Sequence, residues 1–105
     1  MSFPAIDALP PVHPGEILRD DMEALGLSAR KFAQHIGVPS NAVTQILKGE
    51  RGITAAMALR LAKAFGTDPR YWVNLQSDYA TKVARAELGD KIDAIRPLPG
   101  IGEAA

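Results

Sequence analysis

The sequence predicts an all-α domain built from five helices. Apolar residues recur every three or four positions along most of the 105 residues, and no segment alternates polar and apolar residues as a strand would. Glycines, prolines and helix-capping residues divide this pattern into five segments, and two of the shorter segments are joined by a tight turn at Gly37. A hydrophobic share of 47% and a charged share of 23% are those of an ordinary globular domain with one core.

The first helix is expected to begin near residues 14–16 and to end at Gly26, with its acidic residues on the outer face. His13, which precedes Pro14, is expected to shape the start of this helix. The residues predicted to be buried here are Ile17, Leu18, Met22 and Leu25.

The second helix is expected to begin after Ser28, whose hydroxyl can accept a hydrogen bond from a free backbone N–H of the first turn. It should end at Gly37, because glycine enters the left-handed region without a clash at Cβ. Pro39 blocks helical continuation, so a third helix should run from about Ser40 to Lys48. The residues predicted to be buried in these two helices are Phe32, Ala33, Ile36, Val43, Ile46 and Leu47.

The fourth helix is expected to be capped by Thr54 and to stop at Gly66. The fifth and longest helix should start at Asp68 and Pro69, since proline suits the first helical position. The adjacent aromatic residues Tyr71 and Trp72 could stack on nucleobases, but an amphipathic helix favours their packing against the first and fourth helices. The residues predicted to be buried in the fourth helix are Ala58, Leu61, Ala62 and Phe65. In the fifth helix Leu75, Tyr79 and Val83 continue the apolar spacing of three or four residues, so this helix should extend to about Leu88.

Several classes of protein are disfavoured by composition. The chain has no cysteine, and its histidines, His13 and His35, lie far apart without acidic residues at metal-ligand spacing, so neither a metal nor a cofactor is expected. No apolar run approaches the roughly 20 residues of a membrane span, and the N-terminus lacks the pattern of a signal peptide. We therefore expect a cytoplasmic protein.

The second and third helices meet the steric demands of a DNA-binding helix-turn-helix. Such a motif requires a small residue where its helices cross, which is Ala33, and a glycine in the turn, which is Gly37. An apolar plug, Val38, follows the glycine. Four further positions must be apolar to form the core of the motif. These are Phe32, Ile36, Val43 and Ile46.

The outer face of the third helix would then lie in the major groove of DNA. Its polar, uncharged side chains can form hydrogen bonds with base edges. We expect base contacts foremost from Thr44 and Gln45, then from Asn41, and least from Ser40. Alternatively, Ser40, Asn41 and Thr44 are residues that start a helix on a solvated face, and for Ser40 the two explanations have equal weight. The basic residues expected to contact phosphates are Arg30, Lys31, Lys48 and Arg51.

The distribution of charge fits this assignment better than the net charge of zero does. Residues 1–27 carry five acidic residues and one basic residue, whereas residues 28–54 carry four basic residues and one acidic residue. A local positive field suffices to dock on phosphates, although unevenly charged solvated surfaces without a nucleic-acid role are also common.

The chain resembles the HigA family of bacterial antitoxins, which belong to the phage-repressor-like, five-helix DNA-binding domains. The resemblance covers residues 10–88. Its most specific parts are HPGEIL (13–18), VPSNAVTQILKGERGIT (38–54) and FGTDPRYWVNLQSDY (65–79). It implies a helix-turn-helix domain (13–88) that ends in a helix over 68–88 and follows an N-terminal extension (1–12). The tail (89–105) is rich in Pro and Gly, so we expect it to be flexible or loosely docked.

The resemblance also implies a function. HigA-like proteins are homodimers that bind a palindromic operator of double-stranded DNA, repress their own operon and neutralise a RelE-like toxin that cleaves mRNA. The surplus apolar surface on the last helix suggests a dimer interface at Tyr79, Val83 and Leu88. Many related domains have Gln at the position of Ala29, where it contacts phosphate, and here Arg30 or Lys31 would have to take over that contact.

Other functions are weighed against this one. The net charge and Ala29 leave open a protein-interaction module that binds a toxin while its DNA binding is weak, and a solitary transcriptional regulator of the XRE type is a further alternative. An enzyme is not expected, because the sequence offers no Ser/His/Asp or Cys/His arrangement. Glu16 and Asp20 could form a carboxylate pair, but their solvated helix face argues against catalysis.

Overall fold

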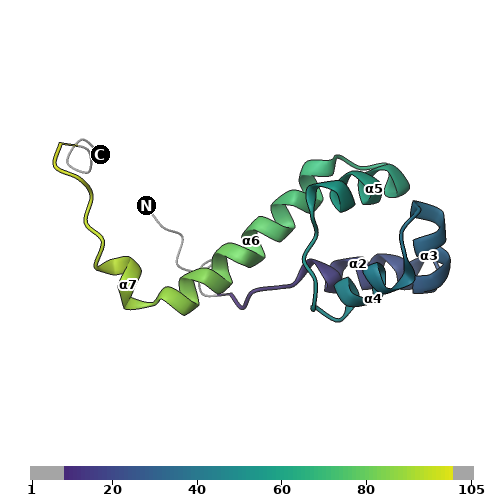
Figure 1. The fold of residues 1–105 in the computed structure, drawn as a ribbon, viewed down its shortest axis with the longest axis horizontal. Helices are drawn as coiled ribbons and strands as arrows, with labels where there is room; N and C mark the ends of the chain where they lie inside the picture. The colour runs from purple at the N-terminus through teal and green to yellow at the C-terminus, as the bar shows by residue number, and fades with distance from the viewer. Residues whose placement is uncertain (1–8, 101–105) are drawn as a thin grey trace.

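A computed structural model describes residues 9–100, and these residues contain six helices and no strand (Figure 1). The helices are α2 (Pro14–Ala24), α3 (Ala29–Ile36), α4 (Ser40–Leu47), α5 (Ala55–Phe65), α6 (Pro69–Leu88) and α7 (Asp90–Asp93). The predicted all-α class with a helix-turn-helix at its second and third helices is confirmed, because α2 to α6 are the five helices expected. Most of the predicted N-terminal extension, residues 1–8, and the last five residues of the predicted tail lie outside the described residues.

The helix ends follow the capping chemistry of the sequence. Ser28 and Thr54 cap α3 and α5, their hydroxyls accepting hydrogen bonds from the backbone N–H groups of Lys31 and Met57. The short helix α7 was not predicted, because Gly89 and the prolines beyond it suggested an irregular tail.

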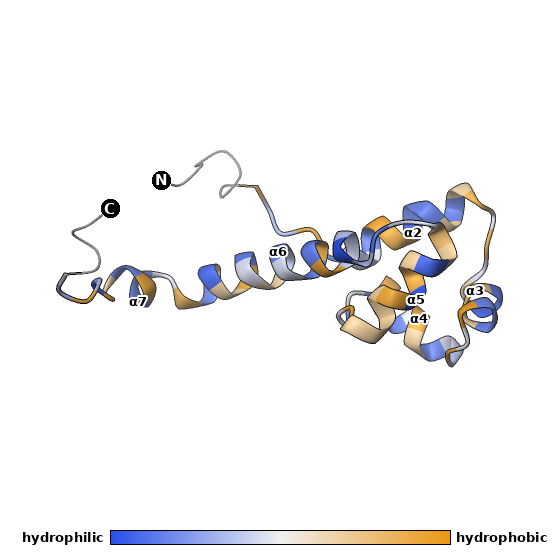
Figure 2. Ribbon diagram, turned by 90° about the horizontal axis from the view of Figure 1, so that it is seen from above, coloured by the Kyte–Doolittle hydropathy of each residue, from blue (hydrophilic) through white to orange (hydrophobic). Residues whose placement is uncertain are grey.

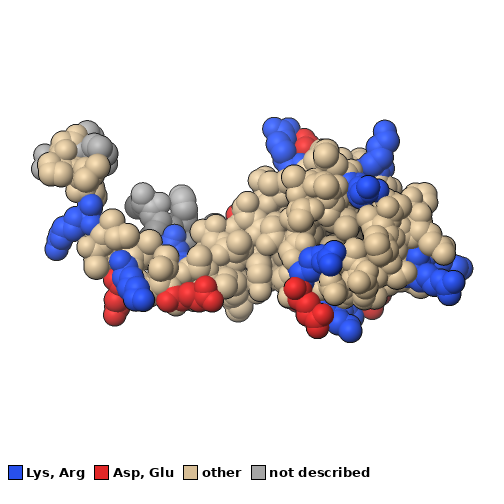
Figure 3. Space-filling view, viewed as in Figure 1, with Lys and Arg blue, Asp and Glu red and all other residues tan. Residues whose placement is uncertain are grey.

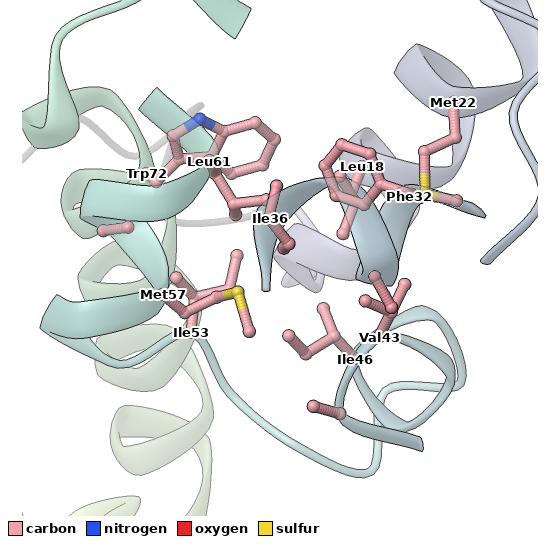
Figure 4. Close-up of a cluster of buried hydrophobic side chains, with 13 residues drawn as sticks. Leu18, Met22, Phe32, Ile36, Val43, Ile46, Ile53, Met57, Leu61 and Trp72 are labelled. Carbon is pink, nitrogen blue, oxygen red and sulfur yellow. The ribbon is translucent and has the colours of Figure 1, made fainter. Parts of the chain in front are cut away.

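The core lies where α2, α3, α4, α5 and the start of α6 converge (Figure 4). Its largest fully buried side chains are Trp72, Phe32, Leu18, Ile46, Leu61 and Val43. Burial of this apolar surface is the main source of stability in a domain of this size, at roughly 25 cal/mol per Å².

Two residues predicted to be buried are exposed. Leu25 is 61% exposed because it is the C-cap of α2, where the chain leaves the helix before the turn at Gly26. Tyr71 is 46% exposed, whereas its neighbour Trp72 is 1% exposed. Adjacent residues on a helix point about 100° apart, so only one of this aromatic pair could face the core.

The molecule consists of a compact body and a projecting arm, with overall dimensions of 54 × 23 × 22 Å. The first half of α6 packs in the body, and its second half continues outward to α7 (Figure 1). Hydrophobic and hydrophilic residues alternate around this arm (Figure 2). None of the described helices is long and apolar enough to cross a membrane.

Candidate nucleic-acid interface

The turn between α3 and α4 has the geometry that the helix-turn-helix prediction requires. Gly37 has φ 76° and donates its N–H to the carbonyls of Ala33 and Gln34. Val38 then donates to the carbonyl of Ala33 at 3.0 Å and is half-buried. Ala33 itself is fully buried at the helix crossing, so the predicted small residue, turn glycine and apolar plug are confirmed.

The orientation of α4 depends on a close crossing with α2. A Cβ atom on Gly15 would overlap the carbonyl oxygen of Ile46, so only glycine allows the two helices to approach this far. His13 fixes the start of α2, as expected, because its Nδ1 accepts the N–H of Gly15 at 2.9 Å while Glu16 accepts the N–H of His13 at 3.3 Å.

Two arginines bond the C-terminal ends of the two helices of the helix-turn-helix. Arg19 of α2 donates to the carbonyl of Leu47 at 2.7 Å and so satisfies the C-terminal end of α4. Arg60 of α5 donates to the carbonyls of Ile36 and Gly37 at the end of α3. Both contacts bring a positive charge to a helix C-terminus, where the macrodipole favours it.

The polar face of α4 lies at the surface of the body. Ser40 and Asn41 are exposed, and Thr44 and Gln45 are half-buried. The side chains of Ser40, Asn41 and Gln45 form no hydrogen bond within the described residues, and the Thr44 hydroxyl donates to the carbonyl of Asn41 at 3.2 Å. Most hydrogen-bond donors and acceptors on this face are therefore free. The exception is the Thr44 hydroxyl, whose hydrogen is used in the bond to Asn41.

The N-terminal end of α4 has no side-chain cap. Its N-cap is Pro39, which forms no side-chain hydrogen bond, so Ser40 does not cap the helix on which it lies. The first N–H groups of α4 consequently keep their capacity to bind a phosphate oxygen.

The four residues predicted to contact phosphates lie at the two ends of the motif, and all are exposed. Arg30 and Lys31 occupy the first turn of α3, and Lys48 and Arg51 follow α4. The loop that carries Arg51 folds back on α4, because the carbonyl of Gln45 accepts the N–H groups of Glu50 and Arg51 at 2.9 and 3.2 Å.

None of these four basic residues forms an ion pair within residues 9–100, where the sole salt bridge joins Arg70 to Asp68. Basic side chains stand out from the body at several places, including the end farthest from α7, whereas the arm carries both signs (Figure 3). The helix-turn-helix therefore offers free positive charge on either side of the polar face of α4.

Three residues were predicted to form a dimer interface on α6. The ring of Tyr79 packs edge-on against His13 of the same chain, with their centroids 4.8 Å apart. Val83 is half-buried, and Leu88 is 42% exposed near the junction with α7. Tyr79 is thus partly used within the chain, and more of the apolar surface lies toward the end of the arm.

The sequence did not reveal the long-range contacts that hold the helix-turn-helix and the loop after α4. Arg19, Arg60 and Gln76 each reach a backbone group more than 20 residues away, and no local pattern identifies such contacts. Gly15 had a visible signal in the HPG triplet, but its role at the helix crossing required the tertiary structure. Within the described residues, no cluster of three or more His, Asp or Glu side chains could hold a metal ion.

Comparison with known proteins adds to this geometry. A family model described as helix-turn-helix matches residues 18–72. Virulence-associated protein I of Dichelobacter nodosus is 41% identical over 93% of this chain and 92% of its own length. An addiction-module antidote protein of the HigA family from Coxiella burnetii has a similar structure, with a TM-score of 0.83 and 48% identity over 85% of this chain and 99% of its own. The Pseudomonas aeruginosa antitoxin HigA, solved with the higBA promoter, has a TM-score of 0.80 and 41% identity over 84% and 98% of the two chains.

Proposed function

This chain belongs to the HigA family of helix-turn-helix proteins, and on that premise we propose that it is a sequence-specific, DNA-binding autorepressor and the antitoxin of a type II toxin–antitoxin pair. The observation that carries the DNA-binding part is the exposed polar face of α4, flanked by basic side chains that pair with no other described residue. The similar HigA of Pseudomonas aeruginosa was solved with promoter DNA, which supports the same role for this chain.

In this proposal α4 lies in the major groove of the operator. Thr44 and Gln45 are the principal residues that contact base edges, followed in importance by Asn41 and then by Ser40. Asn and Gln can pair bidentately with adenine, and the Thr methyl can touch thymine. The basic residues Arg30, Lys31, Lys48 and Arg51 contact phosphates and so fix the register of α4 without reading sequence.

The proposed assembly is a homodimer. A palindromic operator presents two equivalent half-sites, and a two-fold symmetric protein can occupy both at once. The apolar residues on the outer half of α6, including Val83 and Leu88, are the surface assigned to the partner protomer, with Tyr79 at its inner edge.

The proposed protein partner is a RelE-like toxin of the HigB type, a small basic protein that cleaves mRNA. Neutralisation of such a toxin would take place in the cytoplasm, where the operator-bound form would associate with the nucleoid. No catalytic role is proposed for this chain. A solitary regulator of the XRE type is the second candidate, since the helix-turn-helix alone would serve it equally well.

The test is the affinity of the full chain for the promoter upstream of its own gene, measured by fluorescence anisotropy at several salt concentrations. Contacts with phosphates make the logarithm of the affinity fall linearly with the logarithm of the salt concentration. An affinity that is absent, or insensitive to salt, contradicts DNA binding. If the chain does not bind a small basic protein encoded by the adjacent reading frame, the antitoxin function is refuted and the solitary regulator is the function that fits.

A further inference from the structure

We propose that the groove between the C-terminal end of α2 and the start of α6 is the surface that binds the basic toxin. This inference rests on the antitoxin function proposed above, and it assigns the surface that the function needs. The groove has a volume of about 380 Å³ and contains Leu25, Phe65, Tyr71 and Trp72, with Asp21 at its α2 side.

The groove exposes the type of side chain that anchors protein interfaces. Leu25, the C-cap of α2, is 61% exposed, and Tyr71 of α6 is 46% exposed. The ring of Tyr71 is held in place by an edge-on contact with Trp72, with the centroids 5.2 Å apart. A large apolar side chain that is rigid before binding loses little conformational entropy, and tyrosine is enriched among the residues that dominate binding energy.

The charge beside the groove selects the partner. Asp21 lines the groove, and its neighbour Asp20 is exposed on α2. Neither carboxylate forms an ion pair within residues 9–100, so both are free to pair with a cationic partner.

The same charge argues against two other occupants. In a symmetric dimer joined through this face, both copies would bring the same carboxylates to one interface, and like charges brought together at an interface cost free energy. A nucleic acid would be repelled by the same carboxylates. A protein that offers lysine or arginine next to an apolar side chain fits both features of the groove, and a small basic toxin has this chemistry.

The groove is separate from the surface proposed to bind DNA. None of the residues that line it belongs to α3 or α4. The apolar substitutions in the groove should therefore leave the affinity for promoter DNA unchanged, which makes DNA binding an internal control for the correct folding of the Leu25→Ala and Tyr71→Ala variant.

The experiment uses the full chain and, as the probe, the small basic protein encoded by the reading frame adjacent to its gene. Isothermal titration calorimetry gives the dissociation constant for three proteins: the wild type, a double variant Leu25→Ala with Tyr71→Ala, and a double variant Asp20→Lys with Asp21→Lys. We expect each double variant to bind at least about tenfold more weakly, which corresponds to 1.4 kcal/mol.

Matched controls are Leu59→Ala, which removes an equally exposed leucine from α5, and Asp78→Lys, which reverses an exposed charge on α6. Both controls should bind like the wild type.

The outcomes separate this inference from the function on which it rests. Tight binding of the probe to the wild type and to both groove variants overturns the groove assignment and leaves the antitoxin function intact. Failure of the wild type to bind the probe refutes the toxin partner, and the groove assignment with it. A change of oligomeric state in the groove variants, measured by light scattering, would identify the occupant as a second copy and also overturn the proposal.

Discussion

The side-chain oxygen of Gln76 accepts the backbone N–H of Ile53 at 2.7 Å, and this bond ties the middle of α6 to the loop that follows α4. Ile53 is buried, with 6% of its surface exposed, so few other acceptors can reach its N–H. The part of α6 that packs in the body is thereby joined to the loop between α4 and α5.

Loss of this contact should destabilise the domain. We expect Gln76→Ala to lower the free energy of unfolding by about 1–3 kcal/mol, because it leaves a buried donor unsatisfied. Gln76→Glu keeps an acceptor and should recover part of the loss. Urea denaturation measures both, with Asn74→Ala on the exposed side of α6 as the control. Equal stability of the Gln76→Ala and Asn74→Ala variants would show that the bond contributes nothing.

Gln45 should affect the choice of DNA sequence. Gln45→Ala is expected to weaken operator binding by about 1–3 kcal/mol if the side chain pairs with a base, and to leave binding to unrelated DNA almost unchanged. Gln34→Ala, which removes an exposed glutamine from α3, is the control in the same anisotropy titration. A uniform loss on both DNA sequences would assign Gln45 to a phosphate instead.

Lys31 should affect affinity without affecting sequence choice. Lys31→Ala is expected to weaken binding to every DNA sequence and to make the salt dependence shallower by about 1 unit, because one fewer counterion is displaced. Lys63→Ala, an exposed lysine of α5, should leave the slope unchanged. An unchanged slope in the Lys31→Ala variant would remove this residue from the phosphate contacts.

Gly37 should be needed for the fold itself. At φ 76° a β-branched residue is strained, so Gly37→Val should cost on the order of 1–2 kcal/mol or more of stability. Gly37→Asn should cost less, since asparagine tolerates the left-handed region. Thermal unfolding followed by circular dichroism compares the two. An unchanged melting temperature in Gly37→Val is incompatible with the turn described here.

The contribution of Asp68 should depend on pH. The Arg70 side chain and then its backbone N–H lower the pKa of Asp68 below the ordinary value of 3.8. A carboxyl whose pKa is lower in the folded state stabilises it above the unfolded-state pKa and loses this effect as the pH falls through the folded-state pKa. The stability advantage of the wild type over Asp68→Asn should therefore be small at pH 7, since the pair is exposed, and vanish in the acid range below pH 3.8. Urea midpoints at several pH values test this, and an advantage that grows on acidification would contradict it.

The parts of the structure that the sequence predicted are those set by local chemistry. Caps at Ser28 and Thr54 and the turn at Gly37 depend on residues a few positions apart, so they could be recognised without the tertiary structure. The contacts of Arg19, Gln76 and Arg60 span 28, 23 and 24 residues, and no spacing rule identifies their partners. The two errors in the predicted core have a local cause, because periodicity does not show where a helix ends, as at Leu25, or which of two adjacent aromatic residues turns inward, as at Tyr71.

The helix α4 divides its residues into two chemically independent sets. Ala42, Val43 and Ile46 hold it in the core, whereas Ser40, Asn41 and Gln45 form no side-chain hydrogen bond to any other described residue. A substitution in the second set therefore changes the proposed contacts with bases at little cost in folding. Duplicated copies of such a gene can acquire different operators by single mutations, without passing through an unstable intermediate, and regulatory circuits built from them can become insulated from one another.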